Sequence, residues 1–246
     1  MSQAYYKLPG GLVAALEDDQ PFPPLTDALQ QPNGLLAIGG DLSAQRLLDA
    51  YRQGIFPWFS PGDPILWWSP HPRMVMFPDE LHISRSLQKR LKKLDYEVRF
   101  NTDFRQVMQA CATVPRDGQA GTWIVPEMVE AYCELHRLGY AHSVEVWQGQ
   151  AMHETLIGGI YGVALGRAFF AESMFHLVTD ASKIALVYLV RQLQVLGIGM
   201  MDCQMHTPHL ASLGAREISR DEFSFKLSQL IQTHITPVEL KHDTLE

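Results

Sequence analysis

The sequence of 246 residues has few of the features that mark secreted or membrane-bound proteins. Its cysteines are odd in number and far apart (Cys111, Cys133 and Cys203), which excludes a disulfide framework and a CxxC metal site. It has no run of about 18 apolar residues, and its N-terminus lacks the basic start and apolar core of a secretory signal. These absences predict a protein of the reducing cytoplasm that does not associate with membranes.

Positive charge is also scarce, because 20 Lys and Arg residues against 27 Asp and Glu residues give a net charge of −7. Proteins that coat nucleic acid broadly carry an excess of cations, so any RNA contact is expected to be local. The apolar content of 46% and the charged content of 19% are ordinary for a globular protein. The length is sufficient for one large domain, or for one large and one small domain.

An aromatic segment occupies residues 54–73, with the sequence GIFPWFSPGDPILWWSPHPR. It contains five prolines and three of the five tryptophans, Trp58, Trp67 and Trp68. Because each proline fixes φ and removes a backbone donor, the segment predicts a rigid, irregular platform rather than a helix or a strand. Its rings suit stacking on a nucleobase, and they equally suit packing between two domains. Composition favours neither interpretation.

The pattern of apolar residues changes near Arg73, which predicts a small N-terminal domain (residues 1–72) and a larger domain (residues 73–246). In the larger part, three strands are followed by a helix, a strand and a short helix. This order predicts an α+β fold, in which a mixed sheet has one helical crossover between adjacent parallel strands. The pattern resembles the acetyltransferase-like fold of the N-acetyltransferase superfamily.

A basic amphipathic helix is predicted over residues 84–94. At 100° per residue, Arg85, Lys89, Lys92 and Lys93 share one face, and leucines occupy the opposite face. A cationic face of this kind is commonly just solvated. In an otherwise acidic chain it is also suited to local contact with a phosphate backbone.

Two apolar strands are interrupted by polar residues. Glu172 lies within FFAESMF, and Asp202 and Gln204 lie within MMDCQM. The two-residue period of a strand predicts that Asp202 and Gln204 share one face, and neighbouring strands would bring Glu172 to the same end of the sheet. A buried carboxylate costs several kcal/mol unless it is paired, so these residues form either a structural network or a negative pocket for a cationic group.

The chain closely resembles the leucyl/phenylalanyl-tRNA–protein transferases of bacteria. The resemblance rests on motifs that occur in family order over about 190 residues. These motifs are PNGLLAIGGDLS (32–43), AYRQGIFPWFSPGDPILWWSPHPR (50–73), LHISRSL (81–87), GTWI (121–124), LHRLGYAHSVEVW (135–147), LIGGIYGVALG (156–166), FFAESMF (169–175), ASKIAL (181–186) and DCQ with HLASLGAREISR (202–220).

The resemblance implies transfer of leucine, phenylalanine or methionine from aminoacyl-tRNA to the α-amine of proteins that begin with Arg or Lys. The new N-terminus marks such proteins for degradation in the N-degron pathway. Because the aminoacyl ester is already activated, no ATP, metal or coenzyme is expected. A monomer in the cytoplasm is expected.

The resemblance also implies roles for individual residues. Trp58 and Trp123 would contact the terminal adenosine, and Glu172 would receive the cationic acceptor. Asp202 and Gln204 match the catalytic pair, in which Gln204 orients Asp202 and Asp202 withdraws the amine proton; alternatively, the ribose hydroxyl of the tRNA takes that proton. The pocket for the aminoacyl side chain would be lined by Ile160, Phe169, Leu189 and Met201. The acceptor stem would be held by Arg85, Lys89, Lys92 and Lys93.

Two other functions remain open at this stage. One is a coenzyme A-dependent N-acetyltransferase, although no Q/R-x-x-G-x-G/A loop precedes the predicted helix at 180–197 to bind a pyrophosphate. The other is a module that binds tRNA or a degron without catalysis.

Overall fold

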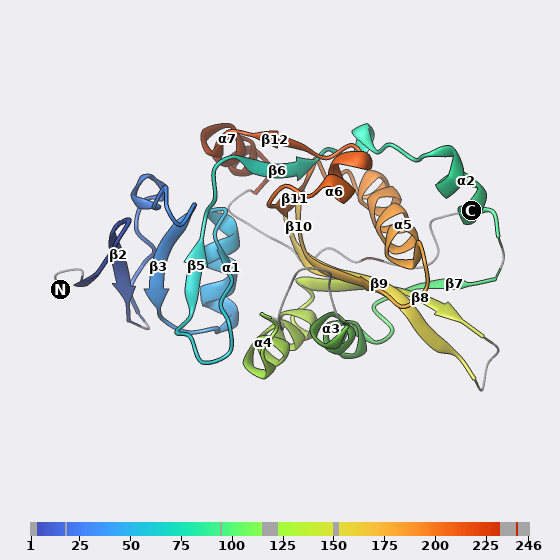
Figure 1. The fold of residues 1–246 in the computed structure, drawn as a ribbon, viewed down its shortest axis with the longest axis horizontal. Coiled ribbons are helices and arrows are strands. Elements are labelled where there is room, and N and C mark those ends of the chain that lie inside the picture. Colours follow the sequence, from blue (N-terminus) through green and yellow to red (C-terminus); the bar gives the residue numbers. More distant parts are fainter. Residues whose placement is uncertain are drawn as a thin grey trace.

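A computed structural model describes residues 4–17, 19–93, 95–114, 123–149, 153–231 and residue 240. Figure 1 shows two β-sheets, the smaller of which lies at the N-terminal end of the molecule. Leu94 of the predicted basic helix and Gly121 and Thr122 of the GTWI motif fall outside the described residues. No helix in the described part of the chain has both the length and the hydropathy of a membrane span.

The small sheet has the strand order β1-β2-β3-β5-β4. Strands β2 and β3 are parallel, and the other neighbours are antiparallel. The elements of this part are β1 (Ala4–Leu8), β2 (Gly11–Leu16), the 3-10 helix η1 (Leu25–Asp27), β3 (Leu35–Gly39), α1 (Ala44–Arg52), β4 (Phe56–Pro57) and β5 (Leu66–Trp68).

The large sheet has the strand order β12-β6-β11-β10-β9-β8-β7. Its strands are β6 (Arg73–Met76), β7 (Glu97–Phe100), β8 (Ala141–Gln148), β9 (Thr155–Leu165), β10 (Ala168–His176), β11 (Met200–Gln204) and β12 (Arg216–Ile218). The helical elements of this part are η2 (Pro78–Glu80), α2 (Arg85–Leu91), α3 (Phe104–Thr113), α4 (Pro126–Arg137), α5 (Ala181–Val195), α6 (Pro208–Ser212) and α7 (Arg220–Leu230). Strands β10 and β11 are parallel and α5 connects them, which confirms the predicted helical crossover and the α+β fold class.

Helices cover both faces of the large sheet. In Figure 1, α3 and α4 lie on one side of β8, β9 and β10, and α5 lies on the other. Along β9, Tyr161 and Val163 belong to the hydrophobic cluster of α3 and α4, whereas Ile160 and Ala164 belong to that of α5. Burial on both faces explains why this strand is apolar at almost every position instead of alternating.

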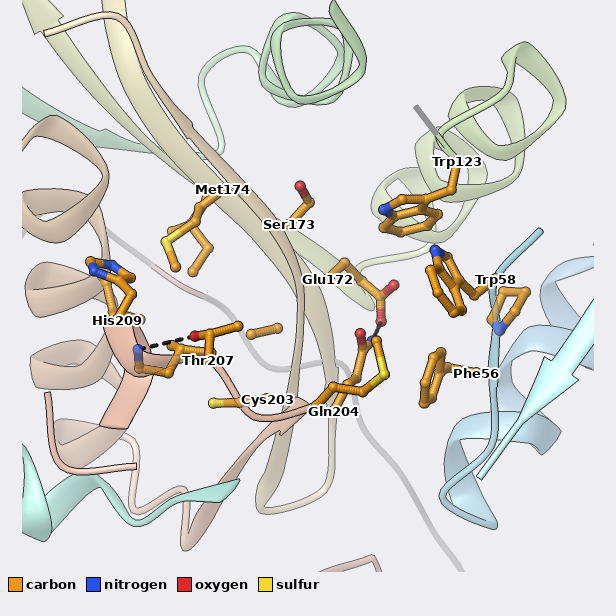
Figure 2. Close-up of a pocket in the computed structure, with 16 residues that line it drawn as sticks. Phe56, Trp58, Trp123, Glu172, Ser173, Met174, Cys203, Gln204, Thr207 and His209 are labelled. Carbon is orange, nitrogen blue, oxygen red and sulfur yellow. Dashed lines mark hydrogen bonds between the residues drawn. The ribbon is translucent and has the colours of Figure 1, made fainter. Parts of the chain in front are cut away.

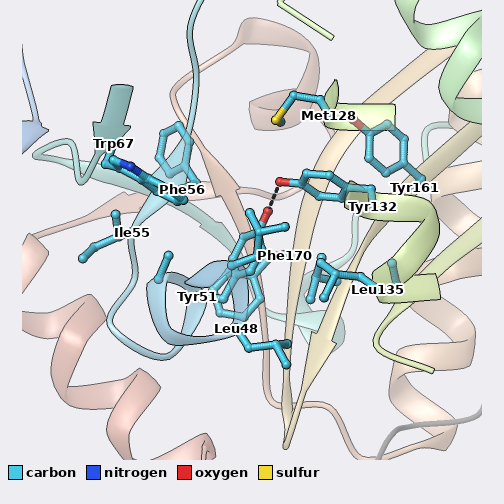
Figure 3. Packing of buried hydrophobic residues seen from close by; sticks show 14 of the residues in the cluster. Leu48, Tyr51, Ile55, Phe56, Trp67, Met128, Tyr132, Leu135, Tyr161 and Phe170 are labelled. Atoms are coloured by element: carbon cyan, nitrogen blue, oxygen red, sulfur yellow. Dashed lines mark hydrogen bonds between the residues drawn. The ribbon is translucent and has the colours of Figure 1, made fainter. Parts of the chain in front are cut away.

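The two sheets share one hydrophobic cluster. Tyr51 of α1 packs against Phe170 of β10, with ring centroids 4.9 Å apart. Figure 3 shows these residues together with Trp67 of the small sheet and Tyr132 of α4. The elements up to β5 and those from β6 onward build separate sheets, but the domain boundary at residues 72 and 73 stays a prediction.

The basic helix is shorter than the sequence predicts. It begins as expected after Ser84, whose hydroxyl accepts a hydrogen bond from Leu87 N, but it ends at Leu91 instead of residue 94. The Tyr96 hydroxyl donates to the carbonyl oxygen of Leu91, a group that a longer helix would use for itself. Lys92 and Lys93 therefore follow the helix.

Candidate active site

A cavity of about 370 Å³ lies where β10 and β11 separate. These strands pair only as far as Phe170 and Asp202, and the residues that follow on each strand line the cavity. Figure 2 shows Trp58 and Trp123 on one side of it, Glu172 and Gln204 near its centre, and Met174 and His209 on the opposite side.

The residues of the aromatic segment divide between the cavity wall and the buried core. Trp58 and Pro57 line the cavity, whereas Trp67 is fully buried against the edge of Phe22, with ring centroids 4.9 Å apart. Trp68 supports the wall, because its indole N–H donates to the carbonyl oxygen of Trp58 over 2.6 Å. The loop that carries Trp58 is therefore fixed by hydrogen bonds to the β5 strand.

Glu172 is the buried acid of the cavity. It lies at an irregularity of β10, where the ladder with β9 shifts between Ala171 and Ser173, and its side chain is 7% exposed. Its carboxylate accepts hydrogen bonds from the hydroxyls of Tyr51 (2.8 Å) and Tyr132 (3.3 Å) and from Gln204 Nε2 (3.0 Å). The two tyrosine hydroxyls are also hydrogen-bonded to each other.

Burial determines the charge state of this cluster. Desolvation raises the pKa of Glu172 to about 8, although the hydrogen bond from Tyr51 opposes that rise. The pKa values of Tyr51 and Tyr132 are raised well above the usual value, mainly by burial and then by the neighbouring Glu172. Both tyrosines therefore remain neutral hydrogen-bond donors.

Asp202 does not lie where the strand period predicts. The described residues that line the cavity do not include Asp202. The strand is irregular here: its ladder with β6 shifts between Asp202 and Gln204, and Gln204 has a φ of +62°. After this irregularity Cys203 and Gln204 both line the cavity. The prediction that Asp202 and Gln204 share a face is wrong, since a bulge interrupts the two-residue period.

Asp202 instead forms a buried ion pair with Arg73. Arg73 Nε and Nη2 donate to the two carboxylate oxygens over 2.8 and 2.6 Å, and both side chains are at most 2% exposed. The backbone N–H of Gln204 donates to the same carboxylate over 2.9 Å. Gln204, which was expected to orient Asp202, contacts Asp202 through its backbone N–H, and its side chain contacts Glu172.

The Arg73 guanidinium lies between two aromatic rings. Its Cζ atom is 4.9 Å from the ring centroid of Phe56, which lines the cavity, and 4.6 Å from that of Phe223 in α7. Favourable cation–π contacts compensate part of the cost of burying this charge. Arg73 Nη1 has no hydrogen-bond partner among the described residues.

Sequence reasoning assigned no role to Arg73, Tyr51 or Tyr132. A signal for Arg73 was present, because an arginine that begins the apolar strand RMVM needs a buried partner. Tyr51 and Tyr132 occupy the apolar faces of α1 and α4, where a tyrosine hydroxyl requires a hydrogen-bond partner.

The residues that were expected to line the pocket for the aminoacyl side chain lie in two layers. Ile160 lines the cavity, whereas Phe169, Leu189 and Met201 are fully buried in the hydrophobic cluster of α5 that also contains Ile160. Apolar residues that the sequence did not single out complete the wall, namely Met174, Leu186 and Leu210.

The expected basic residues lie apart from the cavity. Arg85 and Lys89 are exposed on α2, and Lys92 and Lys93 are exposed just after it. Figure 1 shows α2 beside α5, at the opposite end of the molecule from β2 and β3. Any nucleic acid held by these residues would therefore extend beyond the cavity.

Comparison with known proteins identifies relatives that match most of the chain. The family model described as leucyl/phenylalanyl-tRNA protein transferase matches residues 75–228, and the model of its N-terminal domain matches residues 40–71. The leucyl/phenylalanyl-tRNA–protein transferase of Nitrosomonas europaea is 63% identical over 219 residues, which cover 89% of this chain and 91% of the relative. The enzyme of the same name from Chromobacterium violaceum is 63% identical over 211 residues, which cover 86% and 88%.

The fold is also similar to that of a solved structure, FemX. The TM-score is 0.50 at 10% sequence identity, and the match covers 87% of this chain and 81% of FemX. At this identity the likeness concerns the fold alone.

We predict that Arg73→Met lowers the free energy of unfolding by about 3–5 kcal/mol, because it leaves the Asp202 charge buried and unpaired. Urea denaturation followed by circular dichroism measures this loss. The double variant Arg73→Met with Asp202→Leu removes both charges and should regain most of it. If the single variant were as stable as the wild type, the ion pair would have no structural importance.

Proposed function

The chain belongs to the leucyl/phenylalanyl-tRNA–protein transferase family, and from this premise we propose that it moves leucine, phenylalanine or methionine from aminoacyl-tRNA to the α-amine of proteins that begin with Arg or Lys. The modified N-terminus then marks these proteins for degradation. The observation that carries this proposal is a cavity in which a buried carboxylate faces two tryptophans and an apolar wall.

The two tryptophans are suited to the 3′ end of the tRNA. Trp58 and Trp123 lie on the same side of the cavity, and both retain some exposure, which leaves ring surface for the terminal adenosine. Stacking on an aromatic face contributes about 1–3 kcal/mol per base. The ester between the ribose and the amino acid would then lie near Glu172 and Gln204.

The apolar wall is suited to the aminoacyl side chain. Ile160, Met174 and Leu186 would contact it, and Phe169, Leu189 and Met201 would support these residues from the layer beneath. A polar or charged amino acid would lose hydration there without gaining hydrogen bonds. Selection of Leu, Phe and Met then follows from apolar character and from the shape of the wall.

The polar residues are suited to the acceptor. Glu172 lines the cavity and would receive the positively charged end of the acceptor protein. Gln204 would orient Glu172 through its amide, and Asp202 would fix the backbone of Gln204. We propose a monomer that works in the cytoplasm, where charged tRNA occurs. It needs no metal or coenzyme, because the aminoacyl ester is already activated.

The first test is the reaction itself. Incubation with Phe-tRNA and a peptide that begins with Arg should increase the mass of the peptide by one phenylalanine residue, as measured by mass spectrometry. The same peptide with an acetylated N-terminus is the control and should not change. Binding of both substrates without a mass increase would indicate a binding module, and acetylation by acetyl-coenzyme A would indicate an N-acetyltransferase.

We predict that Trp58→Ala weakens binding of Phe-tRNA about tenfold or more, since it removes a stacking surface for the terminal base. Filter binding or fluorescence anisotropy measures the dissociation constant. Phe225→Ala is a suitable control, because Phe225 is 67% exposed and does not line the cavity. Equal affinities of the two variants would contradict the assignment of Trp58 to the adenosine.

We predict that Lys89→Glu weakens binding of Phe-tRNA more than Lys7→Glu does, and that it reduces the dependence of affinity on salt. The two variants change the net charge equally, but Lys89 lies on α2 and Lys7 lies on β1 of the small sheet. Dissociation constants measured at several salt concentrations provide the comparison. Identical values for both variants would show that α2 is only a solvated surface.

A further inference from the structure

The site has two buried carboxylates, Glu172 and Asp202, in different surroundings. Asp202 is paired with Arg73, accepts a third hydrogen bond from the backbone of Gln204 and does not line the cavity in the described part of the chain. A carboxylate with its oxygens occupied in this way is not available to an amine that enters the cavity. Glu172 lines the cavity, and all of its described hydrogen-bond donors are neutral groups.

The neutral donors leave Glu172 able to change its charge. The hydroxyls of Tyr51 and Tyr132 can donate to a carboxylate or accept from a carboxylic acid, so the cluster remains hydrogen-bonded in both states. Asp202 differs, because its side-chain partner is the cationic Arg73. This difference separates the two acids of the site.

Charged and titratable groups around Glu172 come from several elements. Tyr51 of α1 and Tyr132 of α4 contact it directly, and Asp202 of β11 and Arg73 of β6 act over a longer range with opposite effects on its pKa. Of the remaining titratable groups that line the cavity, burial raises the pKa of Cys203 and lowers that of His209, so both are uncharged near neutral pH.

We propose, on the basis of the proposed function, that Glu172 is the proton acceptor for the α-amine of the acceptor protein, and that Asp202 with Arg73 only positions Gln204. Tyr51, Tyr132 and Gln204 hold the carboxylate at the point where the amine enters. The proton leaves the ammonium for a group that is hydrogen-bonded in both of its charge states.

The acidities of donor and acceptor are matched. An α-ammonium group has a pKa of about 7.7–8.0, and burial raises the pKa of Glu172 to about 8. Proton transfer between groups of similar pKa needs little free energy, and the approach of the ammonium itself favours the carboxylate form. An acid with an ordinary pKa near 4 would take this proton far less readily.

The atoms balance without an additional reactant. The ammonium gives one proton to the Glu172 carboxylate, and the freed electron pair forms the C–N bond to the ester carbonyl carbon. The bond between that carbon and the ribose oxygen breaks. The second proton that the amine nitrogen loses goes to the departing ribose oxygen, and Glu172 later releases its proton to solvent.

The test is the pH dependence of Glu172→Gln. Near pH 7 this variant should lose at least about tenfold in kcat/KM for an Arg-initiated peptide, because a positioned proton acceptor contributes about 10²–10⁴-fold to the rate and an amide cannot replace it. The loss should shrink to about twofold near pH 9, where the amine needs no acceptor. Peptide product is measured at short times, with ester hydrolysis followed in parallel.

A second variant tests whether Glu172 is the group whose titration sets the pH profile. Tyr51→Phe removes a hydrogen bond that lowers the pKa of Glu172, so the rise of kcat/KM with pH should move to higher pH. The matched control is Glu145→Gln, since Glu145 is another fully buried acid with a raised pKa, on β8 and outside the cavity. Its pH profile should coincide with that of the wild type.

Two results would overturn the proposal. An equal loss in Glu172→Gln at all pH values would assign Glu172 to holding the side-chain cation of the acceptor, which stays charged throughout. An unmoved profile in Tyr51→Phe would show that another group titrates. Transfer by the wild-type enzyme in the same assay keeps either failure distinct from a failure of the proposed function.

Discussion

The buried ion pair between Arg73 and Asp202 is the interaction on which the rest of the site depends. It joins β6 to β11 at the point where β11 leaves the ladder. The two rings that enclose the guanidinium come from β4 of the small sheet and from α7 near the end of the described chain. Removal of one charge would therefore disturb the large sheet, the cavity wall and the packing of α7 together.

The contrast between Glu172 and Asp202 shows how two buried acids of one site take different roles. Asp202 has a cation and a backbone N–H as partners, which occupy its carboxylate oxygens. Glu172 has hydroxyl and amide partners, so burial dominates and brings its pKa near that of the acceptor amine. Of the two carboxylates, Asp202 thus has a structural role in an ion pair, and Glu172 is the one that exchanges a proton.

The sequence predicts the fold more completely than the site. The order of strands and helices after residue 141 was sufficient for the mixed sheet and the crossover, because long periodic segments report the burial of each face. The positions of the Asp202 and Gln204 side chains could not be predicted. A bulge changes the face of the strand on which a side chain lies, and the pattern of apolar and polar residues does not show where a bulge occurs. The contact between Tyr51 and Tyr132 was not predicted. The sequence of an amphipathic helix indicates which of its faces is buried, but it does not indicate which residue of another helix packs there.

The parts of the site are widely distributed along the chain, from Tyr51 in α1 to Phe223 in α7. Helix α7 comes later in the sequence than every described residue that lines the cavity. A polypeptide truncated before α7 would keep Glu172, the tryptophans and Phe56, but it would lose the Phe223 ring that packs on the Arg73 guanidinium. Such a fragment would contain every described residue of the cavity wall, but the ion pair that positions Gln204 would be enclosed on one side only.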